Sequence, residues 1–340
     1  MSRLIAVTGG AGYIGVSLVE QLVARGERVR VIDRFFWGKL GLDELPGVEL
    51  ISRDVRELQD GDLEGADAVC HLAGLSNDPT ADLDPKANWQ MNMVATKELA
   101  DAAIRMGVRR ITFGSSGSIY DGAGSDQILD EDAAVNPLGP YSESKFAAER
   151  ALLDVQDKIE VVLLRQGTVG GYSRRMRYDL VVNTFLKDAL LKRHLFLHEG
   201  GFMYRPLVDV LDVAMAHIVC LDAPAAKVAG RVLNVVQDNY QVKQLAEIMA
   251  EAVKPLVGDI KLSTAPATGR IRDYRASNAR MTEATGFTPQ RTPVDSVASV
   301  LERIGEVDPQ ELTHPRHYNL RWMQILTEVH DLQRHYDRVF

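Results

Sequence analysis

The sequence predicts an α/β fold, in which a doubly wound parallel sheet is followed by a smaller C-terminal lobe. A glycine-rich loop links a short apolar run at residues 4–7 to an amphipathic segment at residues 16–23. Further apolar runs of strand length alternate with helical segments through the first half of the chain. Each run ends in a small or polar cluster, as expected where a ligand lies beyond the carboxyl ends of parallel strands.

The expected elements follow one another at the spacing of βαβ units. The strands are expected at residues 4–7, 29–32, 48–51, 68–72, 110–113 and 161–164. Helical segments between them include residues 85–106 and 141–156. Short, nearly continuous apolar runs are typical of strands that are buried on both faces of a parallel sheet.

The loop TGGAGYIG, residues 8–15, lies where the first strand turns into the first helix. Glycines there permit a tight turn and a close approach of the backbone to a pyrophosphate. The first N–H groups of the helix then remain free to bind the anion. A glycine-rich turn without a ligand is the alternative, but here the strand, the helix and a following acidic residue are in register. The loop therefore predicts a dinucleotide site in a Rossmann-type domain.

The choice of dinucleotide depends on the end of the second strand. Asp33 lies there, roughly 20 residues past the loop, where a carboxylate would bind the adenosine ribose hydroxyls. This favours NAD over NADP. Arg34 complicates the choice, because a guanidinium beside the ribose could pair with a 2′-phosphate. We expect Arg34 to be a solvated residue at the strand end, since Asp33 would repel that phosphate.

The composition is that of a globular enzyme. With 340 residues and 46% hydrophobic content the chain can bury a large core. Its net charge of −8 and pI of about 5.6 make nonspecific nucleic-acid binding unexpected. Two cysteines, Cys70 and Cys220, lie in apolar stretches and offer neither a disulfide framework nor metal-ligand spacing. No secretory signal or run of about 20 apolar residues occurs, so we expect a cytoplasmic protein without a membrane segment.

Tyr141 and Lys145 stand four residues apart at the start of an expected helix, which places them on one face. A neighbouring cation and a positive nicotinamide ring would both favour the phenolate of Tyr141. Tyr141 could then remove a proton from a substrate hydroxyl while hydride leaves the same carbon. Ser116, preferred over Ser115 and Ser118, would hydrogen-bond the substrate oxygen. The alternatives are surface residues for the pair and turn-forming hydroxyls for the serines.

Further marks accompany the glycine loop and the Tyr141/Lys145 pair. They are Asp33, residues 54–55, 71–74, Asn92 with Thr96, residues 115–116, 119–120 and 140–145, Arg165, and residues 204–214. Through these marks the chain resembles the extended short-chain dehydrogenases/reductases, in the nucleotide-sugar epimerase and dehydratase branch, and within it proteins similar to UDP-glucose 4-epimerase. The resemblance covers nearly the whole length.

The resemblance implies roles for individual residues. Ser116, Tyr141 and Lys145 would form the catalytic triad. NAD would be bound by Gly9, Gly12, Tyr13, Ile14, Gly15, Asp33, Arg34, Asp54, Val55, Leu72, Ala73, Gly74, Asn92, Tyr141 and Lys145. A nucleotide-diphosphate sugar would be bound by Leu75, Ser76, Ser116, Ser118, Thr168, Asp179, Arg205 and Arg272. Residues 1–167 would form the NAD-binding domain, with 207–236 partly returning to it, and 168–340 mainly the substrate lobe and a C-terminal helical tail.

Departures from the family narrow the reaction. Sugar 4,6-dehydratases of this branch place an Asp-Glu pair after the catalytic hydroxyl, where this chain has Gly117 and Ser118. The glutamate of uronate decarboxylases and the cysteine of epimerase-reductases are also missing at Gly117. Residues 74–75 are similar to those of the 4-epimerases, whereas Asp121 and Asp209 replace the usual glycine and histidine. The reactions of the family that are not excluded in this way require only hydride transfer.

We therefore expect an NAD-dependent nucleotide-sugar 4-epimerase that acts through a transient 4-keto sugar. The alternatives are an NAD(P)-dependent 4-ketoreductase or dehydrogenase on an activated sugar, and a cofactor-sensing protein without catalysis.

Three segments outside the site carry further expectations. Relatives commonly pair through two helices per subunit, so segments 88–106 and 141–156 predict a homodimer of C2 symmetry. The basic run at residues 173–177 could meet phosphate or form a solvated loop. The apolar residues at helical spacing in 320–336 could cover the sheet or add to an interface.

Overall fold

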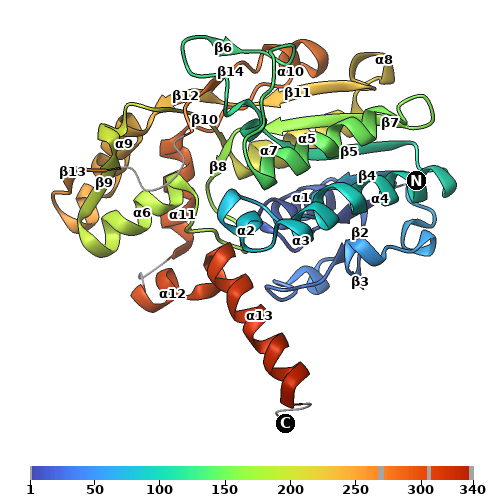
Figure 1. Cartoon of the computed structure of the whole chain (residues 1–340), viewed down its shortest axis with the longest axis horizontal. Coiled ribbons are helices and arrows are strands. Elements are labelled where there is room, and N and C mark those ends of the chain that lie inside the picture. The colour runs from blue at the N-terminus through green and yellow to red at the C-terminus, as the bar shows by residue number, and fades with distance from the viewer. Residues whose placement is uncertain (1, 267–271, 305–307, 337–340) are drawn as a thin grey trace.

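The computed structural model describes residues 2–266, 272–304 and 308–336, and its centre is a parallel sheet of seven strands in the order β3-β2-β1-β4-β5-β7-β11 (Figure 1). The strands are β1 Leu4–Thr8, β2 Arg28–Asp33, β3 Val48–Ser52, β4 Ala68–His71, β5 Arg110–Ser116, β7 Glu160–Gln166 and β11 Arg231–Val235. The six expected strands and the doubly wound fold class are confirmed. The order reverses between β1 and β4, which is where ligands bind in such sheets.

Helices cover both faces of this sheet, because neighbouring residues of each strand point to opposite faces. In β1, Ile5 and Val7 pack with α1, Tyr13–Ala24, and α7, Val210–Asp222, whereas Ala6 belongs to the core on the other face. That second core holds α4, Ala95–Arg105, and α5, Pro140–Leu153. Burial on both faces explains why the strands read as continuous apolar runs.

The expected helix at residues 85–106 is helical throughout but not regular. α3, Pro85–Trp89, runs into a π-helical turn, Gln90–Val94, before α4 begins. Such turns are often found at functional sites. This one carries the fully buried Asn92 toward the edge of the sheet where the strands end.

In its described residues, the second lobe contains three small sheets and a helical layer. The first sheet contains β8 Thr168–Gly170, β10 Tyr204–Asp209 and β12 Asp238–Gln241; the others pair β9 His194–His198 with β13 Lys261–Ala265, and β6 Ile128–Leu129 with β14 Arg275–Ala276. The remaining helices are α2 Asp78–Leu83, α6 Val181–Lys192, α8 Ala225–Val228, α9 Val242–Val257, α10 Ala279–Thr285, α11 Pro293–Ile304, α12 Pro309–Thr313 and α13 Asn319–Tyr336. β11 of this half lies in the main sheet, beside β7.

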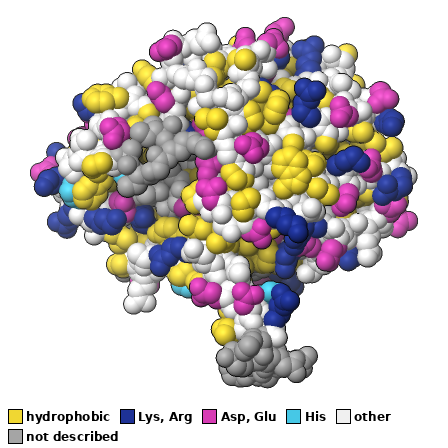
Figure 2. Space-filling view, viewed as in Figure 1, with side chains coloured by type: hydrophobic (Ala, Val, Ile, Leu, Met, Phe, Trp, Pro, Cys, Tyr) yellow, Lys and Arg dark blue, Asp and Glu magenta, His cyan; other side chains and the backbone are white. Residues whose placement is uncertain are grey.

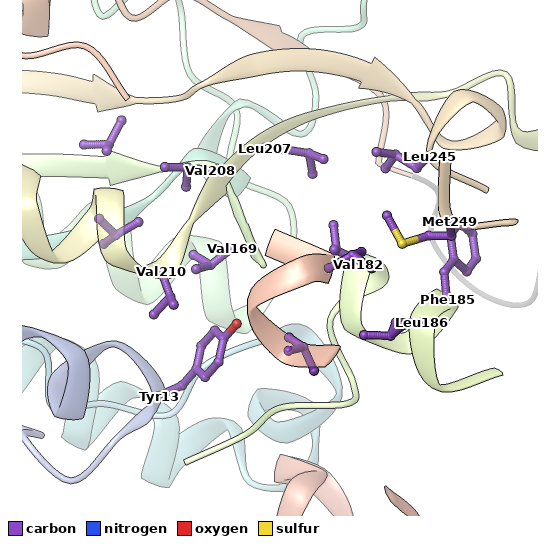
Figure 3. Close-up of a cluster of buried hydrophobic side chains, with 14 of the residues drawn as sticks. Tyr13, Val169, Val182, Phe185, Leu186, Leu207, Val208, Val210, Leu245 and Met249 are labelled. Carbon is purple, nitrogen blue, oxygen red and sulfur yellow. The ribbon is translucent and has the colours of Figure 1, made fainter. Parts of the chain in front are cut away.

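Tyr13 joins the two parts of the molecule. It is the first residue of α1, yet its ring belongs to the core cluster of the second lobe, near Val169 and Val210 (Figure 3). Its hydroxyl donates to the carbonyl of Gly171 at 2.6 Å and accepts from the side-chain amide of Asn183 at 3.1 Å. The tyrosine therefore fixes the second lobe against the glycine loop.

Helix α13 begins against the body of the molecule and then extends away from it (Figure 1). Its first turns are anchored by the indole N–H of Trp322, which donates to the carbonyl of Phe36 at 2.8 Å. Within the described residues, no helix is long and apolar enough to cross a membrane. Acidic and basic side chains are interspersed over the face shown in Figure 2.

Candidate active site in the interlobe cleft

The glycine loop forms the floor of a cleft between the sheet and the second lobe. Gly9 has a positive φ of 72°, and a Cβ on it would lie 2.6 Å from the main-chain nitrogen of Ala73. A Cβ on Gly15 would lie 2.7 Å from Cα of Gly10. The helix that follows has no side-chain cap at Gly12 and no acidic residue in its first turn. These features fit a dinucleotide, whose diphosphate needs close backbone approach and free N–H groups.

The expected adenosine end is built by Asp33 and its neighbours. Asp33 accepts from the main-chain N–H of Ala11 at 3.0 Å and of Phe35 at 2.7 Å, so the carboxylate also fixes the loop. Burial raises the pKa of Asp33, and these hydrogen bonds oppose the change. Arg34 is not simply solvated: its guanidinium lies 2.9 Å from Asp54 and stacks on Phe36 at 4.3 Å. This pairing leaves the 2′-phosphate alternative without support.

Residues after β4 form the second expected contact with the cofactor. Leu72 and Gly74 line the cleft. Asn92 fixes the following residue, because its side-chain amide accepts from the N–H of Leu75 and donates to its carbonyl, both at 2.9 Å. It also donates to the hydroxyl of Ser144 at 3.1 Å. Asn92 therefore positions this segment, and its direct contact with cofactor stays a prediction.

Ser116, Tyr141 and Lys145 meet in the cleft from two elements. Ser116 ends β5, and Tyr141 and Lys145 lie in the first two turns of α5. Gly139 and Pro140 start that helix, with proline at a position where its missing N–H costs nothing. The hydroxyl of Ser116 lies close enough to the phenol of Tyr141 to lower its pKa. Ser115, in contrast, donates to Glu149 at 2.5 Å, which explains why the next serine faces the tyrosine.

The electrostatics of the triad differ from the simplest expectation. Burial raises the pKa of Tyr141, while the hydrogen bond from Ser116 and the charges of Arg272 and Arg177 lower it. Lys145 donates to the carbonyl of Gly114 at 2.8 Å, and burial lowers its pKa to about 8. The two guanidinium groups are thus the cations that favour the phenolate, and the charge of Asp78 opposes them. From the sequence, this effect was expected of Lys145 and of the nicotinamide ring.

Position 117 is closed to a side chain. A Cβ on Gly117 would lie 2.8 Å from the hydroxyl of Tyr274, which is buried and lines the cleft. Ser118 is also buried, and its N–H donates to the hydroxyl of Ser116 at 3.2 Å. An acid at position 117 would require Tyr274 to move. The packing therefore agrees with the absence of a second acid–base pair beside Ser116.

The predicted substrate residues lie in different surroundings. Leu75, Ser76, Thr168 and Arg272 line the cleft. Arg272 is already paired, with Asp121 at 2.9 Å and with Asp78, so a diphosphate would have to compete for it. Arg205 donates to the main-chain carbonyls of Tyr204, at 2.8 Å, and of Arg272.

Asp179 is not free for a substrate either. Its carboxylate accepts from the guanidinium of Arg177 at 2.9 and 3.0 Å and from the N–H of Asn319 at 3.1 Å. The pKa of Asp179 is lowered: burial raises it, but the charge of Arg177 and its hydrogen bonds outweigh burial. Asp179 is thus a structural anchor in this state.

The rest of the cleft wall was not predicted. It includes Trp37, Gln166, Gly167, Arg175, Arg177, Tyr274 and Asn319. These residues come from segments far apart in the sequence. The basic run at 173–177 was the one available signal, and it could not show that Arg175 and Arg177 are buried at the cleft while Arg174 stays 43% exposed.

Comparisons with known proteins agree with this geometry. A model of the NAD dependent epimerase/dehydratase family matches residues 5–235. UDP-glucose 4-epimerase of Corynebacterium glutamicum is 27% identical over 317 residues, which cover 86% of this chain and 93% of the relative. UDP-glucuronic acid decarboxylase 4 of Arabidopsis thaliana is 31% identical over 218 residues, 62% of this chain and 48% of the relative. The structure of MoeE5 in complex with UDP-glucuronic acid and NAD has a TM-score of 0.74 at 27% identity, covering 87% of this chain and 96% of that one.

The Rossmann-type fold and the cleft are those of an NAD-dependent α/β enzyme. The chain belongs to the NAD dependent epimerase/dehydratase family. The expected family, the enzyme class and the cofactor NAD are thereby confirmed. The domain boundary at residue 167 and the individual site residues stay predictions.

Proposed function

We propose that the protein is an NAD-dependent nucleotide-sugar 4-epimerase. The observation that carries this proposal is the combination of Ser116, Tyr141 and Lys145 with a neighbouring position closed to any further acid or base. Gly117 faces the hydroxyl of Tyr274, so this wall supplies no group for eliminating water. Reversible hydride transfer at one carbon needs only a single acid–base residue.

Bound NAD would accept a hydride from C4 of the sugar and return it to the opposite face. The phenol oxygen of Tyr141 accepts the proton of the C4 hydroxyl and later returns it to the C4 oxygen. Ser116 donates a hydrogen bond to the same sugar oxygen, where negative charge develops. Burial raises the pKa of Tyr141 and so opposes the loss of its proton. The nearby positive charges of Arg272 and Arg177 lower this pKa and therefore assist deprotonation.

Lys145 has a different task in this scheme. The carbonyl of Gly114 and the ring of Phe113, 4.5 Å from the ammonium, hold it beside the cleft. With a pKa of about 8 it is mainly charged at neutral pH. It can therefore hold the nicotinamide ribose and place a positive charge near Tyr141 without donating a proton to the sugar.

The names of the relatives support the substrate class. UDP-glucose 4-epimerases align over most of the chain, and MoeE5 was solved with UDP-glucuronic acid and, separately, with UDP-glucose. A nucleotide diphosphate would bind toward Arg205 and Arg272 in the second lobe. Fixing the diphosphate leaves the 4-keto sugar able to rotate, which is what inversion at C4 requires. The nucleotide and the sugar are not assigned.

We propose a cytoplasmic homodimer as the working form. Leu99, Ala102, Ala103 and Leu152 of the two expected interface helices are buried in the core of the subunit. Met91, Val94, Phe146 and Leu153 are half-buried and could form a face for a partner. Light scattering at micromolar concentration tests this. A mass that stays near 37.6 kDa on tenfold concentration contradicts the dimer.

The reaction is tested by incubating the purified protein with UDP-, dTDP-, GDP- and CDP-sugars without added NAD. NMR should detect the C4 epimer of one of them, because an epimerase regenerates its bound NAD. Product that appears only with stoichiometric reduced or oxidised cofactor identifies a ketoreductase or dehydrogenase. Tight NAD binding with no turnover of any sugar identifies a cofactor sensor.

Tyr141→Phe provides the matched control for this experiment. The phenylalanine keeps the ring and removes the acid–base group, so turnover should fall at least about a hundredfold. NAD affinity should stay near that of the wild type. Full activity of Tyr141→Phe would exclude the proposed role of the tyrosine.

A further inference from the structure

Arg175 differs from the other arginines of the cleft in having no carboxylate partner. Arg177 is paired with Asp179 and Arg272 with Asp121. Arg175 is only 3% exposed, yet among the described residues no carboxylate lies within ion-pair distance of it. A buried charge without a direct ion pair is costly, so such a group is suited to binding an anion.

The hydrogen bonds of Arg175 are also incomplete. One terminal nitrogen donates to the side-chain oxygen of Asn319, and the other lies 3.5 Å from the carbonyl of Met176. Both acceptors are neutral. Nε is buried and has no acceptor in the described part of the chain. Arg175 lines the cleft, so these donors can be completed by a ligand there.

The surroundings of Arg175 show which part of the cleft it serves. Its guanidinium stacks on Trp37 at 4.0 Å. It lies within electrostatic reach of Asp179, which is already paired with Arg177, and of Tyr13 and Asp33, at the start of α1 and the end of β2. The first turn of α1 is itself positive and has no acidic residue. Two positive groups, the helix end and Arg175, thus flank the section between the glycine loop and Asp33.

We propose that Arg175 binds the diphosphate of NAD from the second lobe, on the side opposite the glycine loop. A guanidinium can donate two parallel hydrogen bonds to phosphate oxygens, and its charge would then be compensated. The adenosine half of NAD is indicated because Asp33 and Tyr13 are its neighbours. The proposed substrate arginines, Arg205 and Arg272, are bonded to each other elsewhere in the second lobe.

Two further observations agree with this assignment. Burial, followed by the charge of Arg177, lowers the pKa of Arg175 to about 9, and the charges of Asp179, Tyr13 and Asp33 offset this only in part. Asn319, which orients Arg175, donates to Ser76 at 2.8 Å and is the first residue of α13. The C-terminal helix therefore sets the orientation of the guanidinium. The inference depends on NAD binding and not on the proposed 4-epimerase reaction.

The test compares Arg175→Met and Arg175→Lys with Arg174→Met after bound nucleotide has been removed. Arg174 is the matched control, since it lies next in the chain but is exposed and paired with Glu20 at 2.7 Å. Calorimetry measures the affinity for NAD, ADP and UDP, and competition measures adenosine. Arg175→Met should lower the affinity for NAD and ADP about tenfold to hundredfold, the range for losing hydrogen bonds to a charged group. Affinities for adenosine and UDP should change less than about twofold, because those ligands do not place a phosphate on Arg175.

Other outcomes overturn the proposal. An equal loss for adenosine and ADP shows that Arg175 only supports the fold, and a loss for UDP alone places it on the substrate. Unchanged affinities for NAD, ADP and UDP show that Arg175 binds neither the cofactor nor the substrate nucleotide. Should Arg175→Met not fold, Arg175→Lys decides, because it keeps the charge but loses the fork. Its ADP affinity must then fall relative to adenosine, and an unchanged ratio contradicts the proposal.

Discussion

The two walls of the cleft are built in different ways. The wall formed by the sheet, residues 8–15, 72–74 and 114–116, uses main-chain groups and tight glycine packing. The opposite wall, formed by the second lobe, uses long polar side chains such as Arg175, Arg177 and Tyr274. The first wall offers the N–H groups at the start of a helix. The second offers guanidinium groups, some of which are already neutralised by carboxylates from other segments.

This difference predicts that the two walls respond differently to substitution. Main-chain cradles tolerate few substitutions, because a Cβ on Gly15 would meet other backbone atoms. Side-chain walls can change one residue at a time, since each side chain occupies its own space. Small substitutions in the sheet wall should therefore lower stability and ligand affinity sharply, whereas substitutions in the lobe wall should have more gradual effects.

The largest expected effect is a loss of stability in acid, to which two buried histidines behind the sheet wall contribute. Burial lowers the pKa of His71, in β4, and of His217, on α7 beside Thr112 of β5 and Gln166 of β7, to about 3. The unfolded chain binds these protons near pH 6.5, so stability is lost as pH falls from 6.5 toward 3. At pH 4 each histidine should cost about 3 kcal/mol of unfolding free energy.

Urea unfolding at a series of pH values measures this loss. His71→Asn and His217→Asn should each remove one histidine's share of the slope between pH 6.5 and 4. A free energy of unfolding that stays flat over that range in the wild type would contradict the neutral, buried state of both rings.

The next effect tests the tightness of the sheet wall. Gly15→Ala should lower the free energy of unfolding by about 1–3 kcal/mol, because the methyl group overpacks against Gly9 and Gly10. NAD affinity should fall at least about tenfold, as the loop must shift. Gly61→Ala is the control: nothing lies within 4 Å of its added Cβ, so stability should change by less than about 0.5 kcal/mol. Equal losses of stability in Gly15→Ala and Gly61→Ala would contradict the tight packing of the glycine loop.

A smaller effect tests the contact between the walls at position 117. Gly117→Ala should cost about 1–2 kcal/mol of unfolding free energy, since the methyl group meets the hydroxyl of Tyr274. In a Tyr274→Phe background this cost should be smaller, with a coupling of at least about 0.5 kcal/mol in a double-mutant cycle. Strict additivity would mean that Tyr274 does not close the site.

The smallest effect concerns cofactor choice. The wild type should bind NAD more tightly than NADP, because Asp33 repels a 2′-phosphate. Asp33→Asn keeps an acceptor for the N–H of Ala11 but removes the charge, and should narrow the ratio about tenfold, or about 1.4 kcal/mol. Calorimetry with both cofactors measures it. A wild type that prefers NADP would assign Arg34 to the phosphate instead of to Asp54.

Most of the sheet wall could be predicted from the sequence, for a local reason. The strand, the glycines and the helix at residues 4–24 are contiguous, and Asp33 follows at the next strand end. Tyr141 and Lys145 share one helix face by spacing alone. Even here the sequence did not predict which residues contact one another. Asn92 hydrogen-bonds Leu75, Arg34 pairs with Asp54, and the ring of Tyr13 packs in the core of the other lobe.

The sequence by itself determined the fold class and predicted the dinucleotide loop and the acid–base residue, because these depend on periodicity and short spacing along the chain. The tertiary structure alone decided the second wall. Arg175, Tyr274 and Asn319 are separated by up to 144 residues, and they meet only when the second lobe and α13 pack against the sheet. Charge pairing is likewise a matter of proximity in space, so sequence could name the arginines but not show which of them lacks a carboxylate.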